Sequence, residues 1–358
     1  MADSPYPELK KTHTAARAGT PWRDRKPAPA APVWSVIQGY GNYWVLVAAL
    51  ELGLFDELER SGPSTLEPLA KRLGASAPHL GALLDALVAL GLLDRVRKVY
   101  ELNETAERYL TTNGAASMTE LVGVAPGPLG NWQHLAETVR QGRPPSPIED
   151  DPAAFYRPLA RATFPTQRRV ATRTALMIGL ARSARPPRIL DLGAGGAPWT
   201  IAFCEAHPSA TAVVNDLPGV IDVAEEKLDA EGMRDRCELR AGDFRTLELE
   251  PEAYDIVVLG HVCRTEGVDG APELIRRAFA ALAPEGRVVL SDYFVDKTSG
   301  VNPFGALMGV TMMAGTERGL TFTHGQYVAW LRDAGFDPVR LIEPISPNHV
   351  FIGTKPNH

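Results

Sequence analysis

The segment RILDLGAGG, residues 188–196, constrains the fold of this 358-residue chain more than any other feature. A short apolar run ends in Asp191 and leads directly into a glycine-rich turn, where the backbone can bend sharply and approach a ligand closely. Further apolar runs alternate with helical patterns, namely ATAVVND, CELRAGD, YDIVVLG and GRVVLSD, with two late strands near Val339 and Val350. This alternation predicts an α/β fold over residues 186–358, with a doubly wound, mainly parallel sheet whose last strand is antiparallel.

Acidic residues end consecutive predicted strands, at the edge where doubly wound sheets bind ligands. Asp216 is placed to bind the two hydroxyls of a ribose, and Asp243 to accept from an adenine amino group beside the ring of Phe244. Pro198 stands where a dinucleotide fingerprint needs glycine, which argues against a pyrophosphate site. Either acid alone could simply cap a helix, but together they predict an adenosine-containing ligand. The predicted cofactor-binding residues are Asp191, Gly193, Gly195, Asp216, Leu217, Gly242, Asp243, Phe244 and Gly260.

The N-terminal part of the chain has a different, mainly helical pattern. Residues 1–33 combine Pro and Ala with scattered Lys and Arg and are expected to form a flexible leader. Over Trp34 to Leu54, the side chains of Tyr40, Tyr43, Trp44 and Val47 fall on one face, which predicts a helix with a buried stripe. A helix over 66–73, a second helix capped by Ser76 and a hairpin near VRKVYELN predict a winged-helix unit over residues 34–115.

A winged helix raises the hypothesis of DNA binding, which the side chains of its second helix oppose. The helix APHLGALLDALVALGLL has no Lys or Arg, and the chain carries a formal net charge of -6. Its leucines, at 80, 83, 84, 87 and 90, suit a helix buried in a subunit contact. We therefore expect a homodimer formed through the N-terminal helices, and no nucleic-acid partner.

Cysteine usage and hydropathy limit the remaining classes. Cys204, Cys237 and Cys263 lie far apart, which indicates neither a disulfide framework nor a zinc site. The combination of His261, Cys263 and His324 also lacks a recognisable metal-ligand spacing. No apolar run reaches the 18 or so residues that a membrane span needs. The sequence thus predicts a cytoplasmic protein without a metal and without membrane contact.

Residues 116–185 read as a helical linker with a Pro-rich break at 143–152, and they carry aromatic side chains that suit an apolar pocket for a flat substrate. Methionines at helical spacing after Pro303 can contribute to the same pocket. For each residue alone, ordinary core packing is an equally good interpretation. The predicted substrate-binding residues are Trp132, Tyr156, Phe164, Met177, Met308 and Met312.

Residues 35–356 resemble the small-molecule O-methyltransferases of the caffeic acid and hydroxyindole type, with their bacterial relatives in secondary metabolism. The resemblance rests on the winged-helix region, on DLGAGG in place of DVGGGTG, on the NDLP and AGDF segments and on the hairpin ending HVFIGTK. Ala197 stands where the family usually has its last glycine. The resemblance implies a Rossmann-like class I methyltransferase sheet that binds S-adenosylmethionine at Gly193, Asp216, Asp243 and Phe244 and releases S-adenosylhomocysteine.

In this family, the segments after the fourth and fifth strands hold the chemistry. Members that methylate phenols place a catalytic histidine where this chain has Arg264, which stays protonated and is a poor base but can bind a carboxylate or stabilise a phenolate. His261 is a candidate replacement base, with a local hydrogen-bonding role as the alternative. Asp292 and Glu317 occupy the positions of other family acids and could orient an acceptor.

Three functions are compatible with these residues. The first is methyl transfer from S-adenosylmethionine to a small aromatic or polyketide-like metabolite, to an oxygen in the first instance and otherwise to a carbon or nitrogen. The second is a hydroxylation, decarboxylation or pericyclic reaction assisted by the same cofactor, which the loss of the usual base motivates. The third is a non-catalytic regulator, against which the apolar second helix and the negative charge count.

Overall fold

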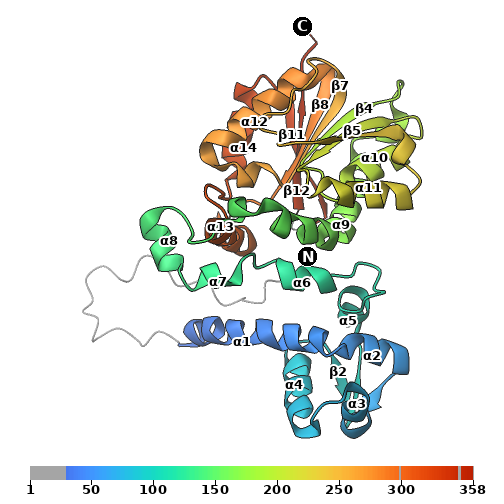
Figure 1. Ribbon diagram of the computed structural model, residues 1–358, viewed down its shortest axis with the longest axis vertical. Helices are drawn as coiled ribbons and strands as arrows, with labels where there is room; N and C mark the ends of the chain where they lie inside the picture. The colour runs from blue at the N-terminus through green and yellow to red at the C-terminus, as the bar shows by residue number, and fades with distance from the viewer. Residues whose placement is uncertain (1–29, 298–299, 346–347, 358) are drawn as a thin grey trace.

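A computed structural model describes residues 30–297, 300–345 and 348–357, and its largest element is a seven-stranded sheet in the order β11-β12-β8-β7-β4-β5-β6 (Figure 1). The strands are β4 (Arg188–Leu192), β5 (Thr211–Asp216), β6 (Cys237–Ala241), β7 (Tyr254–Gly260), β8 (Leu282–Asp292), β11 (Val339–Ile345) and β12 (Asn348–Thr354). Strands β4 to β8 pair in parallel, whereas β12 runs antiparallel between β8 and β11. The predicted doubly wound sheet with an antiparallel last strand is confirmed.

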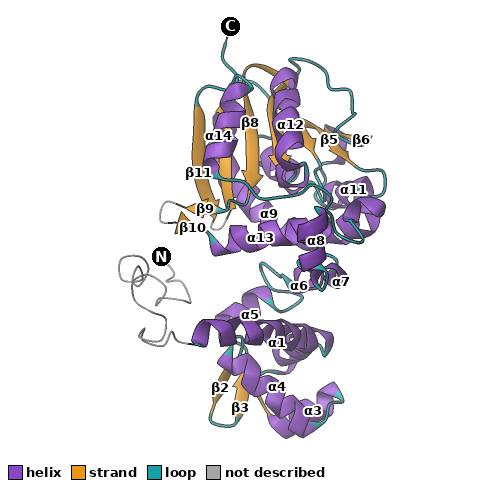
Figure 2. Ribbon diagram, turned by 90° about the vertical axis from the view of Figure 1, so that its left-hand side faces the viewer, coloured by secondary structure: helices purple, strands orange, loops and turns teal. Residues whose placement is uncertain are grey.

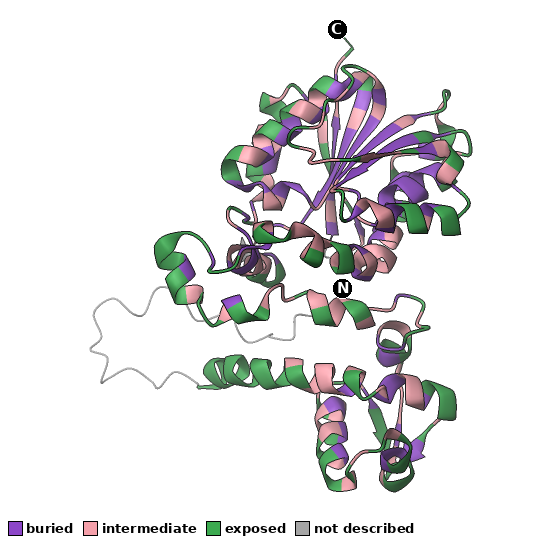
Figure 3. Cartoon of the chain, in the orientation of Figure 1, coloured by how far each residue is buried: buried purple, intermediate pink, exposed green. Residues whose placement is uncertain are grey.

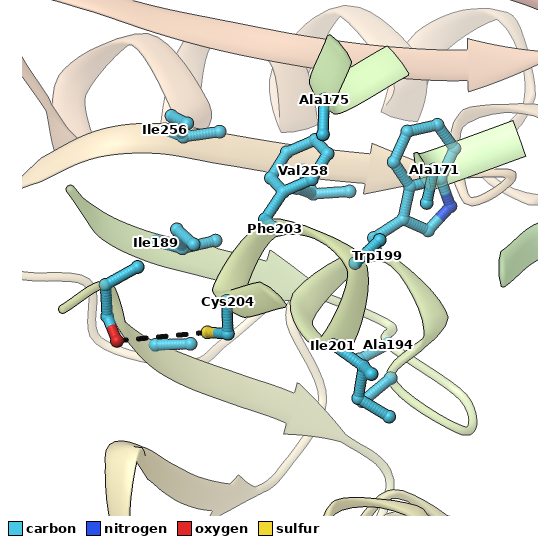
Figure 4. Close-up of a cluster of buried hydrophobic side chains, with 14 of the residues drawn as sticks. Ala171, Ala175, Ile189, Ala194, Trp199, Ile201, Phe203, Cys204, Ile256 and Val258 are labelled. Carbon is cyan, nitrogen blue, oxygen red and sulfur yellow. Dashed lines mark hydrogen bonds between the residues drawn. The ribbon is translucent and has the colours of Figure 1, made fainter. Parts of the chain in front are cut away.

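Helices cover both faces of this sheet, which explains why its central strands are apolar without alternation. Helices α9 (Pro152–Met177), α10 (Pro198–Ala206) and α11 (Ile221–Ala230) pack on one face, and α12 (Gly267–Ala281) and α14 (His324–Asp333) pack on the other. Figure 4 shows the first core, where Trp199 and Phe203 of α10 lie between strand residues such as Val258 and the α9 residues Ala171 and Ala175. These cores fix the strand ends on which the candidate site is built.

The N-terminal part folds as the sequence predicts, with two helices followed by a wing. Its elements are α1 (Ala31–Glu51), α2 (Leu54–Ser61), β1 (Ser64–Thr65), α3 (Leu66–Leu73), α4 (Ala77–Ala89), β2 (Asp94–Val96), β3 (Val99–Glu101) and α5 (Glu104–Tyr109). The three short strands form their own sheet in the order β1-β3-β2. Most of the expected leader lies outside the described residues, and α1 already begins at Ala31, inside the predicted range 1–33.

Three expectations for this part need correction. The stripe on α1 is only partly buried within the chain, since Tyr40 is 75% and Trp44 41% exposed while Tyr43 and Val47 are half-buried. Figure 3 shows the N-terminal half of α1 coloured as exposed. The α4 residues Leu80, Leu84 and Leu87 are instead buried in the chain's own core, because α4 packs on α1 and α3. Apolar surface available for a partner therefore lies on α1 rather than on α4. Ser76 precedes α4, but its hydroxyl contacts the His79 ring instead of a backbone N–H.

The connecting segment lies between the N-terminal helices and the large sheet. It consists of α6 (Thr119–Val124), α7 (Leu129–Trp132), α8 (Leu135–Gln141), η3 (Ile148–Asp150) and the long helix α9. Figure 2 shows α9 and α13 (Pro303–Gly315) below the sheet, on the side of the N-terminal helices. The buried amide of Asn131 donates to the carbonyls of Ser146 and Ala314, which joins α7, the loop before η3 and α13.

The helices differ in length, and α9 and α1 are the longest in the described part of the chain. Neither these two nor any other described helix combines the length and the hydropathy that crossing a membrane requires.

Candidate active site

The glycine-rich turn after β4 depends on glycine at Gly193. Gly193 adopts φ +64°, and a Cβ at this position would lie 2.6 Å from Cγ1 of Val262, close to the ring of Phe244. Gly195 is also left-handed and lies against Ala160 of α9. Ala197, at the N-terminus of α10, has φ 56°, a conformation that costs a residue with a side chain about 1–2 kcal/mol. Ala197 thus adopts a left-handed conformation that glycine would adopt without this cost.

Asp191 supports this turn from behind. Its Oδ2 accepts from the hydroxyl of Thr200 at 2.8 Å and from the Thr200 backbone N–H at 3.2 Å, and the residue is 1% exposed. Burial raises the pKa of Asp191 to about 7 despite these two hydrogen bonds. The carboxylate therefore links β4 to α10, so Asp191 acts as a structural neighbour of a ligand site.

Asp216 connects the end of β5 to the turn. Its carboxylate accepts from the Gly195 N–H at 2.6 Å and from the Leu217 N–H at 2.7 Å. Its backbone carbonyl accepts from the N–H of Gly242, which follows β6. Burial raises the pKa of Asp216 above its ordinary value, against the effect of the two N–H donors. The three strand ends singled out in the sequence are thus joined directly.

Asp243 and Phe244 follow at the end of β6, and an arginine that the sequence reasoning missed joins them. Arg245 donates to Asp243 at 3.1 Å and binds both carboxylate oxygens of Glu266 at 2.8 Å, while its guanidinium lies 5.4 Å from the Phe244 ring centroid. Glu266 is therefore a buried ion-pair partner, 8% exposed, and not the solvated acid that its place at a helix start suggests. Gly260 is close to the Trp199 indole, where a Cβ would meet Nε1 at 3.0 Å.

A buried ion pair occupies the positions where the sequence suggested chemistry. Asp292, which is fully buried at the end of β8, accepts from Nη1 of Arg264 at 3.0 Å and from the Tyr327 hydroxyl at 2.9 Å. The backbone N–H groups of Arg264 and Tyr293 donate to the same carboxylate. Although burial alone would raise it, the Arg264 guanidinium is the main cause that lowers the pKa of Asp292 to about 2. Asp292 is the counter-ion of Arg264 and cannot take up a proton near neutral pH.

The contacts of His261 do not suit it to act as a general base. Its ring nitrogen Nε2 lies 3.1 Å from Oε1 of Gln167, and its ring packs on Tyr293 with centroids 4.7 Å apart. Its Nδ1 is 3.7 Å from Asp292, which is too long for a hydrogen bond. Burial lowers the pKa of His261, so the imidazole is neutral. These contacts favour the positioning interpretation over the catalytic one.

Glu317 lies farther out, in the loop after α13. Its side chain is 38% exposed and 3.4 Å from Arg143, while its backbone N–H donates to both oxygens of Glu149 in η3. Glu149 and Gln167 are two residues that no sequence pattern indicated, since each is brought in by the helical linker from far away in the chain.

Three of the predicted pocket residues, Tyr156, Phe164 and Met312, lie near Arg264 or near the glycine-rich turn. Tyr156 lies near Glu149 and Arg264, and burial followed by the Glu149 charge raises the pKa of its phenol to about 12. Phe164 covers Gly196, whose Cβ would lie 3.1 Å from the ring, and Met312 packs against Gly319 beside the Arg264 carbonyl.

The other three predicted pocket residues are Met308, Trp132 and Met177. Met308 is one turn before Met312 on α13. The indole of Trp132, on α7, donates to the carbonyl of Pro126 in the loop before that helix. Met177 is 50% exposed at the far end of α9, so the structure does not bring it to the others.

Comparison with known proteins decides the family. The family model of the O-methyltransferase dimerisation domain matches residues 34–112, and that of the O-methyltransferase domain matches residues 164–337. A 3-hydroxy-5-methyl-1-naphthoate 3-O-methyltransferase of Streptomyces sahachiroi is 31% identical over 87% of this chain and 91% of its own length. The chain belongs to the O-methyltransferase family. This methyltransferase uses S-adenosylmethionine.

Other relatives extend across kingdoms. The acetylserotonin O-methyltransferase of Bos taurus is 30% identical over 86% of this methyltransferase and 93% of its own length. The structure of human N-acetylserotonin methyltransferase in complex with S-adenosylmethionine superposes with a TM-score of 0.77, at 23% identity, over 93% of this chain and 99% of that one. The likeness to this structure concerns the fold, including the sheet whose strand ends carry Gly193 and Asp216.

Proposed function

We propose that S-adenosylmethionine binds at the carboxyl ends of β4, β5 and β6, where Gly193, Gly195, Asp216, Asp243 and Phe244 hold it. The residues fit this group. Gly193 has φ +64° and no room for a Cβ beside Val262, so the turn must keep a residue without a side chain, which also lets a ligand approach the backbone. The buried carboxylate of Asp216 is a suitable acceptor for ribose hydroxyls. This buried acid at the junction of three strand ends is the observation that carries the proposal.

Leu217, Gly242 and Gly260 complete the proposed site as backbone neighbours of these residues, and Asp191 supports the turn from behind. The cofactor, when bound, supplies an electrophilic methyl group. The chain's own residues bind it, exclude water and hold the acceptor oxygen in line with that methyl group.

We propose that the acceptor is a small aromatic or polyketide-like metabolite, methylated on oxygen. The relatives' names support this class, since they include a naphthoate and an acetylserotonin O-methyltransferase. The pocket would be formed by Tyr156 and Phe164 of α9 together with Met308 and Met312 of α13, with Trp132 at its outer side. Arg264 would face the acceptor, with Asp292 binding its guanidinium and Glu317 at the rim. His261 packs on the Tyr293 ring, over which the guanidinium also lies.

We further propose that residues 34–115 form the dimerisation unit, 116–185 the linker and 186–358 the catalytic unit. The homodimer contact is assigned to α1, because Trp34, Ile37 and Tyr40 are 60%, 56% and 75% exposed on this helix. The three free cysteines are compatible with work in the cytoplasm.

The test is product analysis with a cofactor that carries a deuterated methyl group. We expect a hydroxylated naphthalene or polyketide acceptor to gain the labelled methyl group on oxygen, with S-adenosylhomocysteine formed in equal amount. Consumption of acceptor without incorporation of label would contradict the proposal and favour a cofactor-assisted reaction of another kind.

A further inference from the structure

Arg264 lies between the proposed cofactor turn and the proposed acceptor pocket. Two residues before it, Val262 packs on Gly193, so this segment borders the turn after β4. The Arg264 carbonyl accepts from the Leu320 N–H and lies beside Gly319, which Met312 contacts. Arg264 therefore lies where a cofactor and an acceptor bound at these two places would meet.

The guanidinium of Arg264 is fixed and permanently charged, and most of its N–H donors have no acceptor among the described residues. Its side chain is 14% exposed, its Nη1 binds Asp292 at 3.0 Å, and it lies 5.3 Å from the centroid of the Tyr293 ring. A guanidinium carries five N–H donors, and the bond to Asp292 occupies one of these. Among the described residues, the buried Nε has no hydrogen-bond partner. The group is pre-organised to bind a second oxygen anion.

The groups around Arg264 are poorly suited to remove a proton from an acceptor. The neighbouring carboxylates already accept hydrogen bonds. Asp292 binds Arg264 and Tyr327, Glu266 binds Arg245, and Glu149 accepts from the Glu317 backbone N–H. The neutral imidazole of His261 is bound to Gln167. Burial raises the pKa of the phenols of Tyr156, Tyr293 and Tyr327 and of the Cys263 thiol, so these groups stay protonated. The titratable groups that interact electrostatically with Arg264 are Tyr156, His261, Cys263, Asp292, Tyr293 and Tyr327, and the charges of Glu149, Arg245 and Glu266 lie around Tyr156.

We propose that Arg264 recognises the reacting oxygen as an anion, so that this enzyme methylates oxygen acids that are already ionised at neutral pH, such as hydroxyquinones and enols of 1,3-dicarbonyl compounds, in preference to ordinary phenols. This inference rests on the proposed methyl transfer and adds the class of acceptor. The acceptor proton is lost to solvent before binding. A lone pair of the oxygen anion then forms the new O–C bond as the S–C bond breaks. The electron pair of the broken S–C bond stays on sulfur and neutralises the sulfonium.

Two probes with one carbon skeleton test the proposal, namely 2-hydroxy-1,4-naphthoquinone, an anion at neutral pH, and 2-naphthol, which is protonated there. Binding of the coloured quinone anion to the complex with S-adenosylhomocysteine is followed by its visible spectrum, and methylation of both probes is followed by mass spectrometry across pH. We expect the anion to bind, its methylation to be independent of pH from neutral to alkaline conditions, and 2-naphthol to react in proportion to its ionised fraction.

Substitutions of Arg264 test whether binding of the anion depends on this side chain. R264Q should weaken binding of the quinone anion at least about tenfold while leaving the affinity for S-adenosylhomocysteine unchanged. R318Q, which removes an exposed cation nearby, is the matched control. R264K keeps a cation beside Asp292 and should retain part of the affinity, which protects the test if R264Q does not fold. R264H should increase methylation of 2-naphthol, because a neutral imidazole can remove its proton.

Different results would overturn the proposed function and the acceptor class. Absence of S-adenosylhomocysteine binding to the wild type would overturn the proposed function. If that ligand binds, the acceptor inference is overturned by failure of the quinone anion to bind, by equal affinity in R264Q, or by 2-naphthol reacting at neutral pH as fast as the quinone. Methylation of 6-hydroxy-2-naphthoate at its phenol near neutral pH would show that Arg264 binds a spectator carboxylate instead, and would also contradict the proposal.

Discussion

The carboxylate of Asp216 accepts a hydrogen bond of 2.6 Å from the backbone N–H of Gly195. This contact joins the end of β5 to the glycine-rich turn after β4, so a single acid shapes the turn and faces the ligand that we assign to it. Because the same carboxylate also accepts from Leu217, its orientation is fixed before any ligand arrives.

A methyl group at Gly193 should disturb this turn. In G193A the new Cβ would lie 2.6 Å from Val262 Cγ1 at a backbone φ of +64°, so we expect a loss of about 1–3 kcal/mol in stability and at least about tenfold in affinity for S-adenosylhomocysteine. Calorimetric titration and thermal unfolding measure both. G91A is the matched control, since Gly91 has φ +71° but a Cβ there would meet no described atom within 4 Å. Equal ligand affinity in G193A and wild type would refute the proposed close approach.

Asp191 should make the protein less stable as pH rises. Its pKa is raised by burial to about 7, above the unfolded value near 3.9, so its contribution is fully favourable below about pH 4 and is lost as pH rises toward 7. D191N keeps an acceptor for Thr200 without the charge. We expect it to raise the free energy of unfolding by at least about 1 kcal/mol at pH 8 and to have little effect at pH 4. A pH-independent difference between the two proteins would count against this assignment.

Strand ends and left-handed turns could be predicted from sequence because they depend on local patterns. The acids at 191, 216 and 243 follow apolar runs, and the sheet topology then places them on one edge. Contacts made by the linker could not be predicted in this way. Gln167 meets His261 and Glu149 meets Glu317 only because α9 and η3 lie across that edge.

The buried ion pair should be sensitive to loss of its anion. D292N leaves the Arg264 cation buried without a counter-ion, which should cost about 3–5 kcal/mol, whereas Y327F removes one hydrogen bond and should cost about 1 kcal/mol. Because the folded pKa of Asp292 is lowered to about 2, its stabilisation is present above pH 4 or so and disappears as pH falls toward 2. Denaturant unfolding at several pH values checks both variants. A D292N protein as stable as wild type at pH 7 would be incompatible with this role.

The exposed face of α1 should control the oligomeric state. Ile37 and Tyr40 are 56% and 75% exposed, and changing both to Lys should weaken the homodimer by at least about 1.4 kcal/mol, a tenfold change. Sedimentation velocity at several concentrations measures this equilibrium. V139K is a suitable control, because Val139 is 65% exposed on α8, away from α1. Unchanged dimerisation in the double variant would move the contact to another surface.

The most direct test of the central claim is calorimetric titration of S-adenosylhomocysteine into the wild type and D216N, with the exposed α11 variant D229N as control. We predict binding to the wild type and D229N with equal affinity, and a loss of at least about tenfold in D216N, because the amide cannot replace the buried carboxylate as an acceptor from two ribose hydroxyls and two N–H groups. Absence of binding to the wild type, or full affinity in D216N, would contradict the account.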